Sequence, residues 1–298
     1  MSLGPAILLA RRCIAGKGGV PGEAKNRYLR GAILGVALSL VPLVVVLVVA
    51  DGMIEGITSR YIETGSYHLQ AQPLIRAGES ELEERAQALR TVPGLRGAFA
   101  EMQGAAVALL GNRSAGAALR AVDPLFLQDT GTLEYLRTIE GSSALESSNE
   151  ILLGEALARK LGAHPGDIIS IVTARSGSGA AGLGLMPKVS AFRLKGIVSA
   201  GYRELDSLWA FVNPKAGAKL LSPDNSTVLV GMKVDAPFGD LEKARASAKG
   251  ALPIDWIVST WPESNRNLYS SFTTTRSLLL LVMALAVAVA SVNVGSAL

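Results

Sequence analysis

The sequence predicts a membrane protein with two transmembrane α-helices that flank a large α+β extracytoplasmic domain. Two uncharged apolar runs, residues 31–50 and 277–298, predict the two helices. A helix rises about 1.5 Å per residue, so about 20 residues cross the ~30 Å hydrocarbon core of a bilayer. Between the runs, residues 51–276 hold short alternating strand and helix patterns with charges of both signs, as expected of a folded domain outside the bilayer.

The excess of basic residues is confined to one end of the chain. Residues 1–30 contain six Lys or Arg and a single acid, whereas residues 51–276 contain 23 basic and 24 acidic residues. The positive-inside rule therefore places residues 1–30 in the cytoplasm and residues 51–276 outside a bacterial inner membrane that the chain crosses more than once. No predicted domain carries a basic excess, which argues against a nucleic-acid partner.

Within residues 1–30, apolar side chains at 3, 6, 7, 10 and 14 follow helical spacing and predict a short amphipathic helix on the membrane surface.

Residues 48–50 (VVA) fit a signal-peptide cleavage pattern, but the preceding apolar run is longer than such signals use, so we expect a retained anchor. The single cysteine, Cys13, lies on the cytoplasmic side and excludes an intrachain disulfide.

The segment 51–276 alternates strands rich in β-branched residues with short helices that begin at Gly, Asn or Pro positions. Predicted strands cover residues 67–74, 98–110, 117–122, 168–173, 191–198, 208–212, 227–234 and 254–258. Predicted helices cover residues 79–91, 154–161, 214–221 and 239–249. Residues 138–149 are predicted as a polar loop, and residues 265–276 as a helical stalk that leads into the second membrane helix.

No motif for catalysis, metal binding or a cofactor emerges. Residues 177–182 match G-x-G-x-x-G, but Gly184 and Pro187 follow where a dinucleotide site needs a helix N-terminus, so we expect the tip of a hairpin. His68 and His164 lack a second His or Cys at ligand spacing. We therefore predict no catalytic residues, no metal and no cofactor.

Several strings resemble the lipoprotein-releasing ABC transporter permeases of the LolC/LolE type, within the broader FtsX-like and MacB-type permease superfamily. Residues 35–38 (GVAL) leading to 50–53 (ADGM) are similar to their first membrane helix. Residues 151–158 (ILLGEALA), followed by LG at 161–162 and GD at 166–167, are similar to their I-L-G-x-x-L-A segment. Residues 196–212 are similar to a strand pair with a D-S step, here Asp206-Ser207, and Trp261, Asn265 and Leu268 to the entry of the second helix.

The resemblance implies a MacB-like periplasmic core domain and a mechanical function. It implies a permease without chemistry of its own, which passes the motion of a cytoplasmic ABC ATPase through its helices. The partners it implies are that ATPase, a second permease copy or paralogue, membrane lipid, a lipoprotein substrate and a periplasmic carrier. The family has four membrane helices, so we expect this chain to be the first part of a longer protein.

The resemblance also implies two sets of site residues. One is a path for the lipid beside the outer ends of the two membrane helices, at Val48, Met53, Ile54, Ile57, Tyr269 and Phe272. The other is a carrier-contact loop within residues 175–188, at Gly182, Gly184, Met186 and Pro187.

Two alternatives stay open. The chain is either another mechanotransmitting permease of the same superfamily, for drug or peptide efflux or for activation of a cell-wall hydrolase, or a two-helix membrane sensor.

Overall fold

The computed structural model describes residues 23–75, 77–177, 184–221 and 226–297, and they divide into two compact units. A helical unit combines the segments Met1–Ile57 and Asn267–Leu298, and a domain comprises Thr58–Arg266. The amphipathic helix predicted within residues 2–14 lies outside the described residues.

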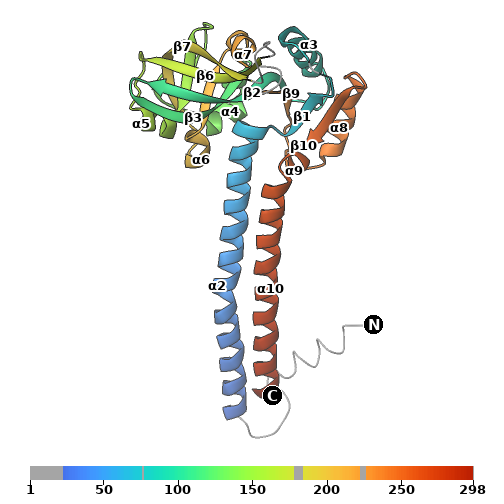
Figure 1. Cartoon of the computed structure of the whole chain (residues 1–298). Helices are drawn as coiled ribbons and strands as arrows, with labels where there is room; N and C mark the ends of the chain where they lie inside the picture. The colour runs from blue at the N-terminus through green and yellow to red at the C-terminus, as the bar shows by residue number, and fades with distance from the viewer. Residues whose placement is uncertain (1–22, 76, 178–183, 222–225, 298) are drawn as a thin grey trace. The chain divides into compact units, whose positions relative to one another are not determined.

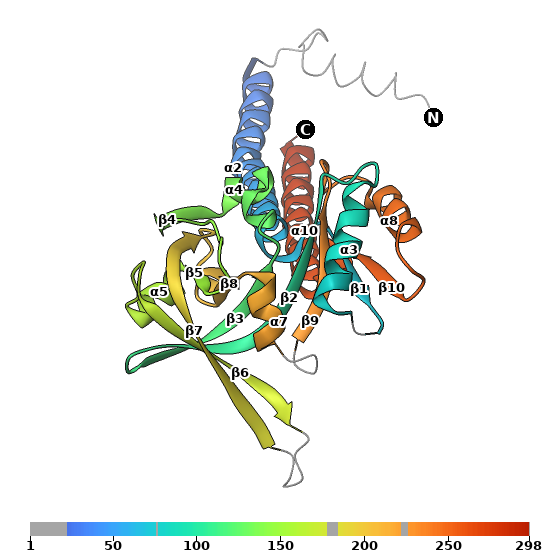
Figure 2. The same cartoon turned by 90° about the horizontal axis from the view of Figure 1, so that it is seen from above.

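The helical unit consists of α2 (Glu23–Tyr61) and α10 (Arg266–Ala297), which run side by side (Figures 1 and 2). An ion pair joins them, since Arg276 Nε lies 3.3 Å from Asp51 Oδ1. The apolar run 31–50 lies inside α2 without interruption. Among the described residues, one helical segment, Tyr269–Val289, is long and apolar enough to cross a membrane. The first membrane span stays a prediction.

The predicted α+β domain is confirmed as a mixed sheet with short helices. In the described part of the chain the strands follow the order β10-β1-β9-β2-β3-β8-β5-β7-β4, and β6 pairs with β2 and β7. The pairs β3–β8 and β5–β7 are parallel and the other pairs are antiparallel. The strands are β1 (Leu69–Pro73), β2 (Gly97–Leu110), β3 (Arg113–Val122), β4 (Arg137–Gly141), β5 (Glu150–Gly154), β6 (Ile168–Gly177), β7 (Gly184–Ser199), β8 (Trp209–Val212), β9 (Ser226–Lys233) and β10 (Trp256–Thr260).

Short helices connect these strands and cover the sheet. They are a π-helical turn η1 (Ile62–Ser66), a 3₁₀ turn η2 (Phe126–Gln128), and the α-helices α3 (Glu79–Arg90), α4 (Thr130–Tyr135), α5 (Glu155–Leu161), α6 (Arg203–Asp206), α7 (Pro214–Leu220), α8 (Leu241–Gly250) and α9 (Trp261–Ser264). Local sequence explains several of their ends. Asp129, Asn213 and Asp240 each accept a backbone N–H at the start of a helix, and Gly162 ends α5 in the left-handed conformation.

Successive residues of a strand point to opposite faces, and the sheet builds a core on each face. Ala98 and Ala100 of β2 belong to the larger core, which includes the buried side of α3 at Leu82, Ala86 and Leu89. Between them in sequence, Phe99 turns to the other face and joins an aromatic core. That second core also contains Tyr67, Phe126, Trp209 and Phe211.

The predicted loop at residues 138–149 is wrong at its start, because β4 occupies Arg137–Gly141. β4 is an edge strand whose five residues are all exposed, so it lacks the apolar alternation that marks a strand in sequence. Strand β5 is also absent from the predicted strands, although its apolar residues lie within the family-like segment at 151–158. By contrast, the helix predicted for residues 265–276 is present from Arg266, where α10 begins and runs on without a break, and its role as a stalk outside the membrane stays a prediction.

We expect Gly217→Ala to destabilise the domain. A Cβ at this position of α7 would overlap the Cβ of Ala121 on β3, so the helix would have to move away from the sheet. Overpacking of this kind costs about 1–3 kcal/mol of unfolding free energy, offset by up to about 1 kcal/mol of helix propensity. Chemical denaturation of the purified full chain in detergent measures the loss.

Gly250→Ala is the matched control, because Gly250 also lies in a helix and a Cβ added there would meet nothing within 4 Å. It should leave stability unchanged or slightly raised. Equal stability of the two variants would show that α7 has room to adjust.

A buried charged anchor as the candidate functional site

The chain changes direction where α2 ends. Helix α2 passes into the π-helical turn η1, and Tyr67 then turns the chain into β1. Among the described residues Tyr67 is the one non-glycine with a positive φ, at φ 60° and ψ 171°, a region that side chains disfavour. Such strain persists only where the surroundings hold the residue in place, and π-turns are frequent at functional sites. We call residues 60–66 the anchor.

Tyr67 is held by a buried ion pair beneath the anchor. Its ring lies flat against Gly231, at a distance that leaves no room for a Cβ, and its hydroxyl donates to Glu101 Oε2. Arg120 donates from Nε to Glu101 Oε1 at 2.6 Å and from Nη2 to Oε2 at 2.9 Å. Its remaining Nη1 donates to the carbonyl oxygen of Thr64, at 2.6 Å, and so ties the anchor to β3.

Aromatic rings surround this ion pair. The guanidinium carbon of Arg120 lies 5.0–5.4 Å from the ring centroids of Phe126, Trp209 and Phe211. Burial raises the pKa of the Tyr67 hydroxyl well above its ordinary value. Burial alone would lower the pKa of Arg120, but the Glu101 charge and hydrogen bonds raise it instead. The site therefore holds a neutral tyrosine and a buried, hydrogen-bonded ion pair, each of whose polar groups has a partner.

A second charged group joins the anchor to β9. Lys233 is fully buried, and its ammonium donates to Asp129 Oδ2 at 2.8 Å and Thr132 Oγ1 at 2.6 Å and lies 2.9 Å from Glu63 Oε2. These three acceptors satisfy its three donors. Arg96 Nη2 lies 3.0 Å from the same Glu63 oxygen, so two cations face the two carboxylates.

His68 completes this group through both ring nitrogens. Its Nδ1 accepts the backbone N–H of Val234 at 2.9 Å, so the ring proton is on Nε2, which lies 3.1 Å from Glu63 Oε1. Burial alone would raise the pKa of Glu63, but His68 and Lys233 outweigh it and hold that pKa at about 2. The pKa of Asp129 is lowered as well, again against the effect of burial, mainly by Lys233.

The two ends of the domain's chain are also joined to each other. Tyr61 Oη donates to Asn265 Oδ1 at 3.1 Å, and Asn265 Nδ2 donates to Ser66 Oγ at 3.0 Å. Asn265 is held in turn through Trp261, whose backbone N–H donates to the carbonyl of His68. We call the contacts of Tyr61, Ser66 and Asn265 the clasp.

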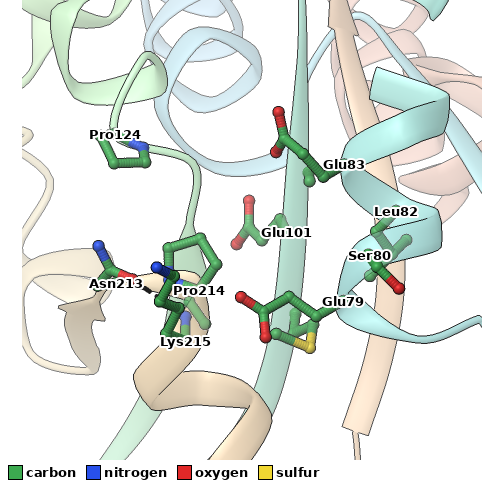
Figure 3. Close-up of a pocket in the computed structure, with 12 residues that line it drawn as sticks. Glu79, Ser80, Leu82, Glu83, Glu101, Pro124, Asn213, Pro214 and Lys215 are labelled. Carbon is green, nitrogen blue, oxygen red and sulfur yellow. Dashed lines mark hydrogen bonds between the residues drawn. The ribbon is translucent and has the colours of Figure 1, made fainter. Parts of the chain in front are cut away.

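A cleft of about 590 Å³ opens between α3 and α7 and leads toward Glu101. Figure 3 shows Glu79 and Glu83 on the α3 side, Pro214 and Lys215 on the α7 side, and Glu101 between them. Alanines and Met102 of the sheet line its floor. Glu101 is 1% exposed and already bonded to Arg120 and Tyr67, so its carboxylate belongs to the buried ion pair and not to the cleft.

The six residues of the predicted lipid path divide between two faces of the helical unit. The side chains of Val48, Met53 and Tyr269 are exposed, by 64%, 61% and 43%. Ile54, Ile57 and Phe272 are half-buried and belong to stripes of half-buried side chains at helical spacing on α2 and α10. The six residues therefore include both exposed and half-buried side chains, and the structure does not gather them into one surface.

The predicted carrier-contact residues belong to a long hairpin. Gly182 lies outside the described residues, whereas Gly184, Met186 and Pro187 lie on β7 opposite Gly177, Arg175 and Ala174 of β6. Gly184 and Pro187, which follow the G-x-G-x-x-G pattern, thus belong to a strand and not to the helix that a dinucleotide site needs. Figure 2 shows the β6–β7 arm reaching away from the rest of the domain.

Sequence reasoning missed the anchor and its partners. Sequence reasoning considers His68 only as a metal ligand and rejects that role, and none of the charged residues found at the site is among the predicted site residues. The available signal was a charge within an apolar strand pattern, as at Glu101 and Arg120, or at the end of one, as at Lys233. Such a charge requires a buried partner, although sequence alone does not show which one.

Comparison with known proteins agrees with this fold. The family model of the MacB-like periplasmic core domain matches residues 31–235. The lipoprotein-releasing system transmembrane protein LolC of Xylella fastidiosa, from strains 9a5c and Temecula1, is 27% identical over 255 residues. That alignment covers 83% of this chain and 59% of the LolC chain, so this chain spans about three fifths of the length of those relatives.

A search of solved structures finds the periplasmic region of MacB from Actinobacillus actinomycetemcomitans, with a TM-score of 0.45 and 13% identity over 70% of this chain and 95% of that one. The extracellular domain of the ABC-type transporter YknZ from Gram-positive bacteria has a TM-score of 0.40 and 13% identity, over 60% and 88% of the two chains.

The chain belongs to the family of the MacB-like periplasmic core domain. Its similarity to LolC confirms the resemblance to LolC/MacB-type permeases that the sequence strings indicate.

We expect Arg120→Met to lower the unfolding free energy by about 3–5 kcal/mol, because it leaves Glu101 charged, buried and without its partner. The double variant Arg120→Met/Glu101→Leu should be less destabilised than Arg120→Met. Arg159→Gln, which removes an exposed ion pair with Glu155, is the control and should change stability by less than about 1 kcal/mol. Denaturation in detergent measures the unfolding free energy of all three variants. Equal losses for Arg120→Met and Arg159→Gln would contradict the role assigned to Arg120.

The anchor also predicts loss of stability in acid. A carboxylate whose pKa is lower in the folded state stabilises the fold above its unfolded pKa, and this contribution disappears as pH falls through the folded value. For Glu63 the window extends from pH 4.5 down to about 2. Glu63→Gln should be less stable at pH 7 and should lose less stability across that window. Glu84→Gln, an exposed change on α3, should retain the wild-type profile, and identical profiles for all three proteins would exclude this role for Glu63.

Proposed function

We propose that this chain is the permease subunit of an ABC transporter that uses ATPase-driven motion to release lipoproteins from the inner membrane toward a periplasmic carrier. The similarity to LolC over 83% of the chain is the observation that carries the proposal. Membership of the MacB-like periplasmic core domain family supports a mechanical permease more generally.

The proposed orientation follows from charge. The basic residues of 1–30 favour a cytoplasmic N-terminus, with the domain Thr58–Arg266 on the periplasmic side of a bacterial inner membrane. In this orientation a first span within 31–50 and a second within 277–298 anchor the chain. The helical segment Tyr269–Val289 supports the second span and begins nearer the domain.

The proposed mechanism assigns no bond chemistry to this chain. A cytoplasmic ABC ATPase hydrolyses ATP, and the chain pairs with a second permease copy or paralogue. The anchor is suited to receive motion, because its residues are tied to β3 through Arg120 and to β9 through Lys233. A segment bonded in this way moves together with the sheet, since displacing it would strand buried charges.

The clasp is suited to couple the two points at which the chain enters and leaves the domain. Tyr61 ends α2 and Asn265 immediately precedes α10, and they hydrogen-bond to each other. On this proposal, a change in the separation of the two helices reaches the domain through these residues. The acyl chains would pass along Val48, Met53, Ile54, Ile57, Tyr269 and Phe272, and the β6–β7 arm would meet the carrier.

The first test is gentle extraction of the native protein from its own membranes, followed by mass spectrometry of what accompanies it. The proposal expects a cytoplasmic ABC ATPase in the complex. Absence of an ATPase would contradict it and favour a two-helix sensor. An ATPase without any effect of depletion on lipoprotein release would favour drug or peptide efflux, or activation of a cell-wall hydrolase, by the same superfamily.

A coupling variant tests the mechanism. Asn265→Ala removes the clasp's bonds to Tyr61 and Ser66, so lipoprotein release by the intact complex should fall several-fold while the ATPase still co-purifies. Asn149→Ala, at an exposed position, is the control and should leave release unchanged. Full release by the Asn265 variant would show that the clasp does not transmit motion.

A further inference from the structure

The segment after β7 forms a closed turn that no part of the proposed transport mechanism uses. Asp206 is 3% exposed, and its carboxylate accepts Ser199 Oγ–H at 2.6 Å and the Ala200 backbone N–H at 2.7 Å. The Gly201 N–H donates to Ser199 Oγ at 3.2 Å. We call residues 199–207 the Asp206 turn; it contains the Asp206-Ser207 step noted in the sequence.

The Asp206 turn packs tightly against the start of α5. A Cβ at Gly154 would overlap the carbonyl oxygen of Asp206, so only glycine permits this approach. A pocket of about 510 Å³ lies between them. It is lined by Glu155, Ala156, Arg159, Lys160, Ser199, Gly201, Arg203, Asp206 and Ser207.

Arg60, in the last turn of α2, reaches the same turn. Its Nη1 donates to the carbonyl oxygen of Gly201 at 3.2 Å, and its guanidinium lies 5.9 Å from the ring centroid of Tyr135. Gly201 has φ +66°, and a Cβ there would overlap Arg60 Nη1. The turn is therefore shaped to accept this arginine, and three cationic side chains, Arg159, Lys160 and Arg203, line the pocket itself.

The charge left available at the pocket is positive. Asp206 is occupied by its own turn, and Glu155 pairs with Arg159. Arg203 and Lys160 are exposed, and in the described part of the chain neither side chain has an ion-pair or hydrogen-bond partner. Ser199 and Ser207 also line the pocket, but their hydroxyl protons are donated to Asp206 and to the carbonyl oxygen of Glu204. The guanidinium of Arg203 and the ammonium of Lys160 are the groups that suit a phosphate ester.

We propose that this pocket binds the phosphate headgroup of an anionic phospholipid. The lipid source is favoured because Arg60 belongs to the same helix as the proposed first membrane span, and because Tyr202 and Leu208 beside the pocket are 37% and 48% exposed. Tyrosine and basic side chains together are typical of membrane interfaces. The inference rests on the proposed insertion of α2 in a membrane and not on transport.

The test is a titration of the purified full chain, in neutral detergent, with dioctanoyl phosphatidylglycerol, dioctanoyl phosphatidylcholine or inorganic phosphate. We expect the wild type to bind phosphatidylglycerol at least about tenfold more tightly than phosphatidylcholine. The double variant Lys160→Gln/Arg203→Gln should weaken phosphatidylglycerol binding by about 10- to 30-fold. Denaturation without lipid establishes that this variant is folded.

The control is Lys215→Gln/Lys243→Gln, which removes the same charge from exposed positions on α7 and α8 and should bind as the wild type does. Equal weakening by both double variants would overturn the proposal, because attraction would then follow net charge. Equal binding of the two lipids, or inorganic phosphate binding as tightly as phosphatidylglycerol, would overturn it too. A missing ATPase partner would affect only the transport proposal.

Discussion

Arg120 and Glu101 are 2% and 1% exposed, so each charge depends on the other, and on nearby hydroxyl and carbonyl groups, in place of water. The pair lies in the aromatic core and joins the short segment that holds Thr64 and Tyr67 to the neighbouring strands β2 and β3. Replacing such a pair with apolar residues often preserves stability, whereas removing one partner does not. In this protein the ion pair fixes the place where the chain that leaves α2 enters the sheet.

The second charged group also holds the anchor in place, here through a buried ammonium. Lys233 is a compact ammonium with three acceptors, and Glu63 receives it together with His68 and Arg96. The Arg120–Glu101 pair contacts the anchor at the backbone carbonyl of Thr64, and the Lys233 group contacts it at the Glu63 carboxylate. Two independent attachments prevent the segment from rotating about either one. This is the physical basis for treating residues 60–66 as one body with the sheet.

Local contacts cover part of the sheet edge formed by β10, which is the opposite edge from β4. β10 ends the strand order, yet the Trp256 N–H donates to Pro253, the Trp256 carbonyl accepts from Lys249 Nζ, and the Thr260 N–H donates to Glu263. Thr260 and Glu263 form a capping box at the start of α9, so one pair of residues ends the strand and begins the helix. Unpaired backbone at a strand edge attracts other chains, and these bonds satisfy some of its donors and acceptors. The domain's last strand thus passes directly to Asn265 and the clasp.

The sequence by itself determined the apolar runs, the confinement of basic charge to one end, most strands of the domain and the family resemblance, because hydropathy and periodicity are local properties. It also argued against a dinucleotide site at the G-x-G-x-x-G segment, since Gly184 and Pro187 do not start a helix. The exposed edge strand β4 escaped prediction because it has no apolar face, and the pairing of Arg120 with Glu101, or Lys233 with Glu63, depends on strand order. Only the tertiary structure decided these partners, since residues 63, 129 and 233 meet through a sheet whose neighbours are distant in sequence. The same holds for Arg60 and Gly201, which lie 141 residues apart and are joined by one hydrogen bond.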